Sequence, residues 1–156
     1  MTMRCLVFFL VAFPVLFASN QIRIKDLELK ILNGAKNGAA YVSIYNGNTY
    51  GVALYKVEVN PEVFDGVELH DHVPRKNENG TEYMEMIEIP EMEITPGATL
   101  FLQPGNKHLM LMGIKSALCQ FKKLKFQFFF KSKDTTFQQI VEVDIPKSPR
   151  CKMFIS

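Results

Sequence analysis

The 156-residue sequence lacks a strong charge of either sign and lacks an apolar run long enough to cross a bilayer. Its formal net charge is +2 and no block of like charges occurs, which argues against nucleic acid or an anionic membrane as a partner. The apolar run at residues 6–17 is interrupted by Pro14 and is shorter than the ~20 residues of a membrane-spanning helix. Low-complexity tracts and internal repeats are also missing, so the length indicates one compact domain.

Residues 1–19 have the features of a secretory signal peptide. Arg4 is the only charge, the short apolar run follows it, and the small residues Ala18 and Ser19 close the segment. Cys5 precedes the apolar run and so cannot be a lipidation site behind it. We therefore predict a signal peptide over residues 1–19 and an exported domain over residues 20–156, with an uncleaved anchor as the alternative.

Cysteine is rare, and two cysteines remain after residues 1–19 are removed. In an oxidising compartment, an even pair such as Cys119 and Cys151 forms a disulfide more often than a reactive site. Such a bond would contribute roughly 3–4 kcal/mol through the loop it closes. A copper role for Cys119 is a weaker alternative.

No catalytic constellation is recognisable in the sequence. It contains no serine or cysteine nucleophile in a histidine context, no glycine-rich phosphate loop and no paired carboxylate motif. We therefore expect that the protein is not an enzyme.

Short apolar runs alternate with turn residues from residue 20 onward, and no segment has the pattern of a long helix. Leu124, Phe126 and Phe128 alternate with polar residues, as on one buried face of a strand. The pattern predicts an all-β protein, an antiparallel β-sandwich of the cupredoxin-like or immunoglobulin-like kind. The expected strands are residues 22–31, 40–45, 52–59, 67–72, 82–89, 99–102, 108–113, 124–131 and 137–145.

Histidine and methionine are concentrated in one part of the chain. All three histidines and five of the six methionines outside residues 1–19 lie between residues 70 and 112. Period-two geometry places His108, Met110 and Met112 on one face of a strand. Met84 and Met86 repeat the two-residue spacing on an earlier strand, so imidazoles and thioethers can converge.

Neutral thioether and imidazole donors together favour copper(I). Zinc sites normally use thiolates, histidines or carboxylates, and thioethers are poor zinc ligands. A blue-copper site needs a cysteine ligand together with two histidines and a weak axial methionine, and no histidine follows Cys119 in the sequence. Methionine is also a common core residue. For Met84, Met92 and Met112 we therefore favour core packing or support of the ligands, and His72 is equally a spare ligand or an exposed neighbour.

The spacing of these residues resembles the periplasmic copper chaperone family PCu(A)C. That family has the pattern His-x10-Met-x21-His-x-Met, and Met86-x21-His108-x-Met110 matches it. Fifteen residues separate His70 from Met86, and the excess falls in the polar residues 73–81, where we expect an extended hairpin tip. The similar segments are residues 39–46, 68–72, 83–86, 100–105 and 107–115.

The resemblance implies a cupredoxin-like β-sandwich in the periplasm that binds copper(I) through His70, Met86, His108 and Met110. It also implies delivery of copper toward the binuclear copper centre of cytochrome c oxidase, with the copper-binding subunit as acceptor. Residues 147–156 lack histidine, so we expect no second site in the tail. Copper buffering, and a sandwich that binds no metal, are the alternatives.

Overall fold

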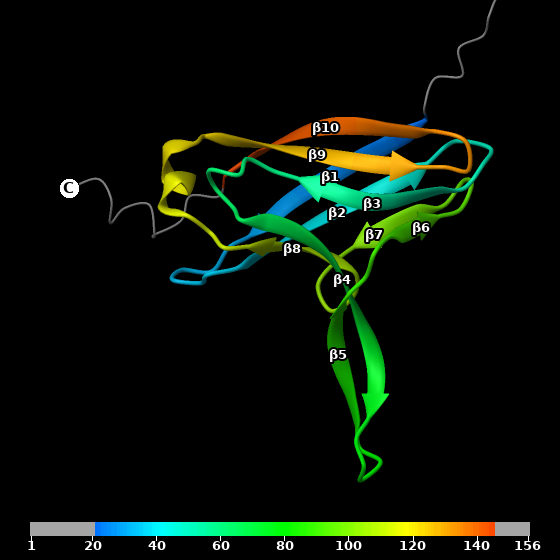
Figure 1. Ribbon diagram of the computed structural model, residues 1–156, viewed down its shortest axis with the longest axis horizontal. Helices are drawn as coiled ribbons and strands as arrows, with labels where there is room; N and C mark the ends of the chain where they lie inside the picture. The colour runs from blue at the N-terminus through cyan, green and yellow to red at the C-terminus, as the bar shows by residue number, and fades with distance from the viewer. Residues whose placement is uncertain (1–20, 146–156) are drawn as a thin grey trace, which may run out of the picture.

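The computed structural model describes residues 21–145, so the predicted signal peptide and the C-terminal residues 146–156 lie outside the described residues. The described chain forms two antiparallel β-sheets (Figure 1), which confirms the predicted all-β sandwich. No helix within residues 21–145 is long and apolar enough to cross a membrane. The elements are β1 (Ile22–Lys30), β2 (Gly38–Asn46), β3 (Val52–Glu58), β4 (Gly66–Lys76), β5 (Glu82–Glu88), β6 (Met92–Ile94), β7 (Thr99–Leu102), β8 (His108–Met112), the 3₁₀ helix η1 (Ser116–Gln120), β9 (Lys123–Lys131) and β10 (Thr136–Asp144).

The larger sheet has the order β1-β2-β8-β4-β5, and the smaller has the order β10-β9-β3-β6. Strand β2 pairs with β8 through its first residues and with β7 through its later residues. Strand β4 lies between β8 and β5 and therefore connects the centre of the larger sheet to its edge.

The core lies between the two sheets and is built from alternating residues of each strand. In β9, Leu124, Phe126 and Phe128 are fully buried, which confirms the predicted alternation. In β8, Leu109 and Leu111 are also fully buried. Because side chains alternate across a strand, the intervening residues of β8 lie on the outer face of the larger sheet.

Two features of the strands differ from the prediction. The three-residue strand β6 was not expected; its Met92 and Ile94 are buried at the edge of the smaller sheet. Strand β4 continues four residues beyond the predicted end at His72 and includes Pro74. Pairing with β8 ends at His70, so Pro74 lies where β4 has only β5 as a neighbour and a missing N–H is tolerated.

The β4–β5 hairpin projects from the sandwich (Figure 1) and confirms the expected extended tip. The Asn77 carbonyl accepts a hydrogen bond from Gly80 N–H at 2.9 Å, and Asn77 Oδ1 accepts one from Thr81 N–H at 2.8 Å. Gly80 has a φ of 79°, a conformation that favours glycine. An ion pair of 3.0 Å between Lys76 and Glu82 joins the two strands beside the turn.

Cys119 lies in η1 and is disulfide-bonded. Its predicted partner, Cys151, lies outside the described residues. The pairing of these two cysteines therefore stays a prediction.

Candidate metal centre

The pairing of β4 with its two neighbours brings the three histidines together. His70 lies directly opposite His108 of β8, and His72 lies directly opposite Met86 of β5. Directly opposed residues point to the same face of a sheet, and residues two apart on one strand do so as well. His70, His72, Met86, His108 and Met110 therefore share the outer face of the larger sheet.

His108 lies in the middle of the cluster. Its ring centroid is 5.2 Å from that of His72 and 5.7 Å from that of His70. Only 5% of His108 is exposed, whereas Met86 is 46% exposed. The cluster is thus buried at His108 and open to solvent at Met86.

A hollow of about 310 Å³ on this face brings four of these side chains to one space. His72 and Met86 line it from the hairpin, and His108 and Met110 line it from β8. His70 does not line it, although it shares the same face. The remaining lining residues are Lys30, Leu32, Asn37, Gly38, Ala39, Tyr41 and Gly105.

One backbone carbonyl orients two of the histidines. The Nδ1–H of His72 donates to the carbonyl oxygen of Asn106 at 3.0 Å, and the Nδ1–H of His108 donates to the same oxygen at 2.9 Å. A carbonyl oxygen only accepts hydrogen bonds, so each Nδ1 carries the proton of its neutral ring. The Nε2 lone pair of each ring is therefore free to bind a metal ion, an arrangement common among metal-ligating histidines.

His70 has the opposite arrangement. Its Nε2 lies 2.8 Å from Oε2 of Glu68 and donates to that carboxylate, which leaves the lone pair on Nδ1. This Nδ1 is buried and makes no hydrogen bond among the described residues. His70 thus has a buried lone pair that no hydrogen bond uses, and it does not line the hollow that His72 lines.

Burial lowers the pKa of His108 below its ordinary value of 6.5, and the neighbouring His72 and His70 act in the same direction. The Asn106 carbonyl and, more weakly, Asp71 raise the pKa of His108, and burial outweighs them. The ring is therefore neutral at neutral pH, which is the form that binds metal ions. Asp71 also forms a 2.5 Å ion pair with Lys107, which ties the residue after Asn106 to β4.

The donor set contains imidazole and thioether groups and carries no charge of its own. Within residues 21–145, no group of three or more His, Cys, Asp or Glu side chains is arranged to hold a metal ion without methionine. Uncharged soft donors suit copper(I) far better than magnesium, calcium or a structural zinc ion. The residues present thus fit a copper(I) ion.

The other methionines of the cluster have different environments. Met92 is 1% exposed, which confirms core packing for this residue. Met112 is partly buried on the outer face of β8. Met84 is 56% exposed, so core packing is wrong for this residue, because the hairpin that carries it stands clear of the sandwich. Support of the ligands, the other expected role of Met84, stays a prediction.

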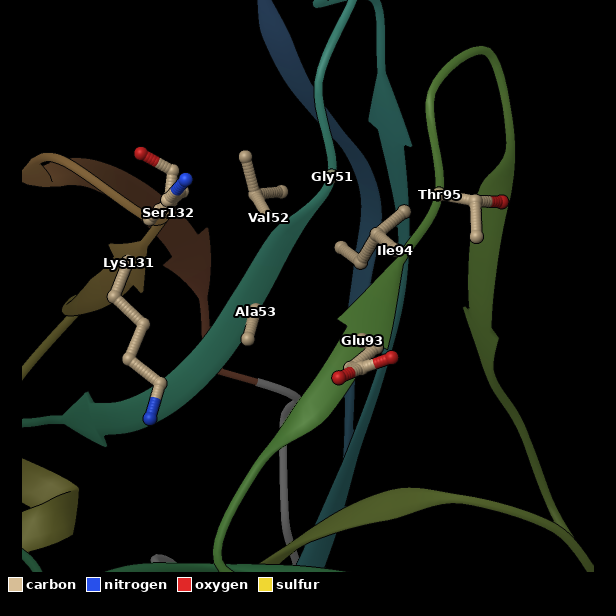
Figure 2. A pocket seen from close by; sticks show the side chains of 9 residues that line it. Gly51, Val52, Ala53, Glu93, Ile94, Thr95, Lys131 and Ser132 are labelled. Carbon is tan, nitrogen blue, oxygen red and sulfur yellow. The ribbon is translucent and has the colours of Figure 1, made fainter.

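A second hollow, of about 270 Å³, lies on the smaller sheet between β3, β6 and the end of β9 (Figure 2). Figure 2 shows Lys131 and Glu93 on either side of Ala53. Lys131 is ion-paired with Glu91, and the lining of this hollow contains no histidine, methionine or cysteine. Its chemistry offers no comparable set of metal ligands.

The sequence model of the LpqE-like family, described as lipoprotein LpqE-like, matches residues 19–144. The chain belongs to the LpqE-like family. None of the curated proteins matches this LpqE-like chain in sequence.

Solved structures of PCuAC domains share the fold of this LpqE-like protein. The apo PCuAC domain from PmoF1 has a TM-score of 0.60 and 19% sequence identity, over 80% of this chain and 92% of that chain. The copper-bound PCuAC domain from PmoF2 has a TM-score of 0.57 and 18% identity, over 83% and 97% of the two chains. These likenesses confirm the predicted β-sandwich and show that its fold resembles that of PCuAC domains, as the sequence pattern predicted.

Proposed function

We propose that this LpqE-like protein binds one copper(I) ion through His72, Met86, His108 and Met110. The observation that carries this proposal is the hollow lined by all four side chains, in which both imidazoles are held by the Asn106 carbonyl with Nε2 free. Two imidazoles and two thioethers complete a four-coordinate set for a soft ion. The copper-bound PCuAC domain from PmoF2 has the same fold, which supports copper as the ion.

In this proposal, His72 takes the ligand position that the resemblance to the PCu(A)C family implied for His70. His72 lies opposite Met86, whereas His70 lies opposite Glu88 in the same hairpin. The hydrogen bond of His70 to Glu68 occupies its Nε2, the atom that reaches farthest from the backbone. His70 as the first ligand stays an alternative, and its free Nδ1 is the atom that would bind.

The proposed role is that of an exported protein that carries copper. The family is described as one of lipoproteins, which are exported, and residues 1–19 have the pattern of a signal peptide. Cys5 precedes the apolar run, so we propose cleavage of the signal peptide without lipid attachment. The periplasm is the compartment that fits this export and the disulfide-bonded Cys119.

We further propose that the protein delivers copper by ligand exchange toward the binuclear copper centre of cytochrome c oxidase. Met86 is 46% exposed and His108 is 5% exposed, so an acceptor can reach the weak thioether ligand first. Donor atoms of the acceptor would then replace the ligands of the protein one at a time. This stepwise exchange makes release gradual without any change in the oxidation state of copper.

Competition for copper(I) between the metal-free protein and the chromophoric chelator bicinchoninate tests the binding proposal. We expect a one-to-one complex that His108→Asn and Met110→Leu each weaken by about tenfold or more, because even groups that only support a ligand change metal affinity 10–100-fold. Met112→Leu, on the same face of β8 but outside the proposed set, is the matched control. A protein without a one-to-one complex, or one indifferent to both substitutions, would refute the site.

Transfer is tested separately from binding. The copper-loaded protein is mixed with the metal-free copper-binding subunit of an oxidase, and copper in the acceptor is followed spectroscopically. Delivery predicts transfer faster than spontaneous loss of copper to the solution. Tight binding without accelerated transfer would favour copper buffering instead.

A further inference from the structure

The β4–β5 hairpin carries an exposed methionine outside the proposed copper set. Met84 is 56% exposed and lies two residues before Met86, on the same face of β5. Its partner across the hairpin is Pro74, whose side chain has no polar atom. Figure 1 shows the hairpin projecting from the sandwich, so Met84 fills no core and its exposure lacks a packing explanation.

The geometry of a strand allows Met84 and Met86 to hold one ion together. Their Cα atoms are about 6.7 Å apart along an extended strand. Methionine is unbranched and has three rotatable side-chain bonds, so the two sulfurs can approach one another. Two sulfurs bound to one metal ion, each about 2.3 Å away, lie at most about 4.6 Å apart, which is within the reach of both side chains.

Few other groups compete for this position. Toward the tip of the hairpin, Lys76 and Glu82 form an ion pair with each other. These hard, charged groups are poor partners for copper(I), whereas a thioether is a good one. Met84 is therefore the next soft donor outward from Met86.

We propose that Met84 is a transfer ligand, which binds copper(I) together with Met86 while the ion enters or leaves the site. This inference rests on the proposed copper site. During release, a copper–sulfur bond to Met84 forms as the bonds to His108 and Met110 break, and donor atoms of the acceptor then replace His72, Met84 and Met86 in turn. Copper remains copper(I), each exchanged bond uses a lone pair of its ligand, and no electron is transferred.

The test compares the rate of copper release with the affinity at equilibrium. Full-length protein loaded with copper(I) is mixed rapidly with excess bathocuproine disulfonate, and the coloured chelate is followed in time. We expect Met84→Leu to slow release several-fold. Its affinity, measured with bicinchoninate, should stay within about twofold of the original value because Met84 is not a ligand of the resting site.

Met112→Leu is the matched control. Met112 also lies two residues from a proposed methionine ligand on the same strand face, but it lies on β8 and is partly buried. It should leave both the release rate and the affinity unchanged. Thermal unfolding of both variants verifies that the fold is intact.

The outcomes separate this inference from the function on which it rests. If the unmodified protein binds one copper(I) and Met84→Leu releases it at the same rate, the transfer role is refuted and the copper site stands. If Met84→Leu weakens the affinity as much as Met86→Leu, Met84 is a resting ligand and the transfer role is again refuted. If the unmodified protein does not bind copper(I), both proposals fail.

Discussion

His72 lies directly opposite Met86 in the β4–β5 hairpin, while His70, two residues earlier, lies opposite Glu88. Both histidines point to the same face, so the register of the hairpin determines which imidazole meets the thioether. The turn at residues 77–81 sets that register. The fifteen residues that separate His70 from Met86 are thus accommodated by the extended β4–β5 hairpin.

We predict different effects for substitution of the two hairpin histidines. His72→Asn should weaken copper(I) binding by about tenfold or more, since it removes a proposed ligand that lines the hollow and whose Nδ1, not its Nε2, is bound by the Asn106 carbonyl. His70→Asn should have a smaller effect on affinity, because its Nε2 is engaged by Glu68. Competition with bicinchoninate measures both affinities under the same conditions.

A larger loss of affinity in His70→Asn than in His72→Asn would identify His70 as the ligand, through its Nδ1. X-ray absorption spectra of the copper-loaded protein provide the control, because a lost imidazole ligand removes nitrogen scattering at the copper. Met112→Leu should leave the spectrum and the affinity unchanged.

The lowered pKa of His108 predicts how the stability of the metal-free protein depends on pH. The unfolded chain binds a proton at this imidazole near pH 6.5, but the folded protein binds it only at lower pH. The free energy of unfolding should therefore fall as the pH decreases below 6.5, by at most about 1.4 kcal/mol per pH unit for this one proton, and stop falling from this cause below the folded pKa. Above pH 6.5 this contribution is complete.

Urea unfolding of the metal-free protein between about pH 7.5 and pH 5 measures this dependence. His108→Asn should reduce the slope in the acid range. An identical slope in that variant would contradict a lowered pKa at His108. Copper(I) affinity should also fall in acid, because protonated imidazole does not coordinate, and the share due to His108 should appear only below pH 6.5.

Gly113, which directly follows β8, should be intolerant of a side chain. Its φ is 58°, and a Cβ atom at this position would collide with the side chain of Asp65. Asp65 forms a 3.0 Å ion pair with Lys115, so the collision also disturbs that contact. Gly113→Ala should therefore lower the free energy of unfolding by about 1–3 kcal/mol.

Gly66→Ala is the control for this prediction. Gly66 has no heavy atom within 4 Å of an added Cβ, and it lies opposite Met112, one residue before Gly113. Its effect on stability should stay within about 0.5 kcal/mol. Equal stability of the two variants in urea would show that the collision is relieved without cost.

We predict that Cys119 is paired with Cys151. Cys119 is disulfide-bonded, and these two cysteines are the ones that remain after cleavage at residue 19. Alkylation of the secreted protein without reduction should add no mass, and proteolysis should release a peptide pair that contains both residues. Detection of two free thiols would disprove the pairing.

Strands β8 and β9 could be predicted from the sequence because their information is local. Leu124, Phe126 and Phe128 alternate with polar residues, and Leu109 alternates with His108 and Met110. Period-two alternation specifies which side chains face the core wherever one face of a strand is buried. The two-residue spacing of His108 from Met110, and of Met84 from Met86, likewise indicated which donors share one face of a strand.

The tertiary structure decided the features that depend on distant pairings. The Asn106 carbonyl orients both His72 and His108, and a backbone oxygen leaves no signal in the residue pattern. The exposure of Met84 follows from a hairpin that extends past the sandwich, and a methionine on a strand looks the same in sequence whether buried or exposed. Thus the sequence alone determined the kind of donor group available and the strands that carry it, whereas strand register, burial and backbone position determined which side chains meet.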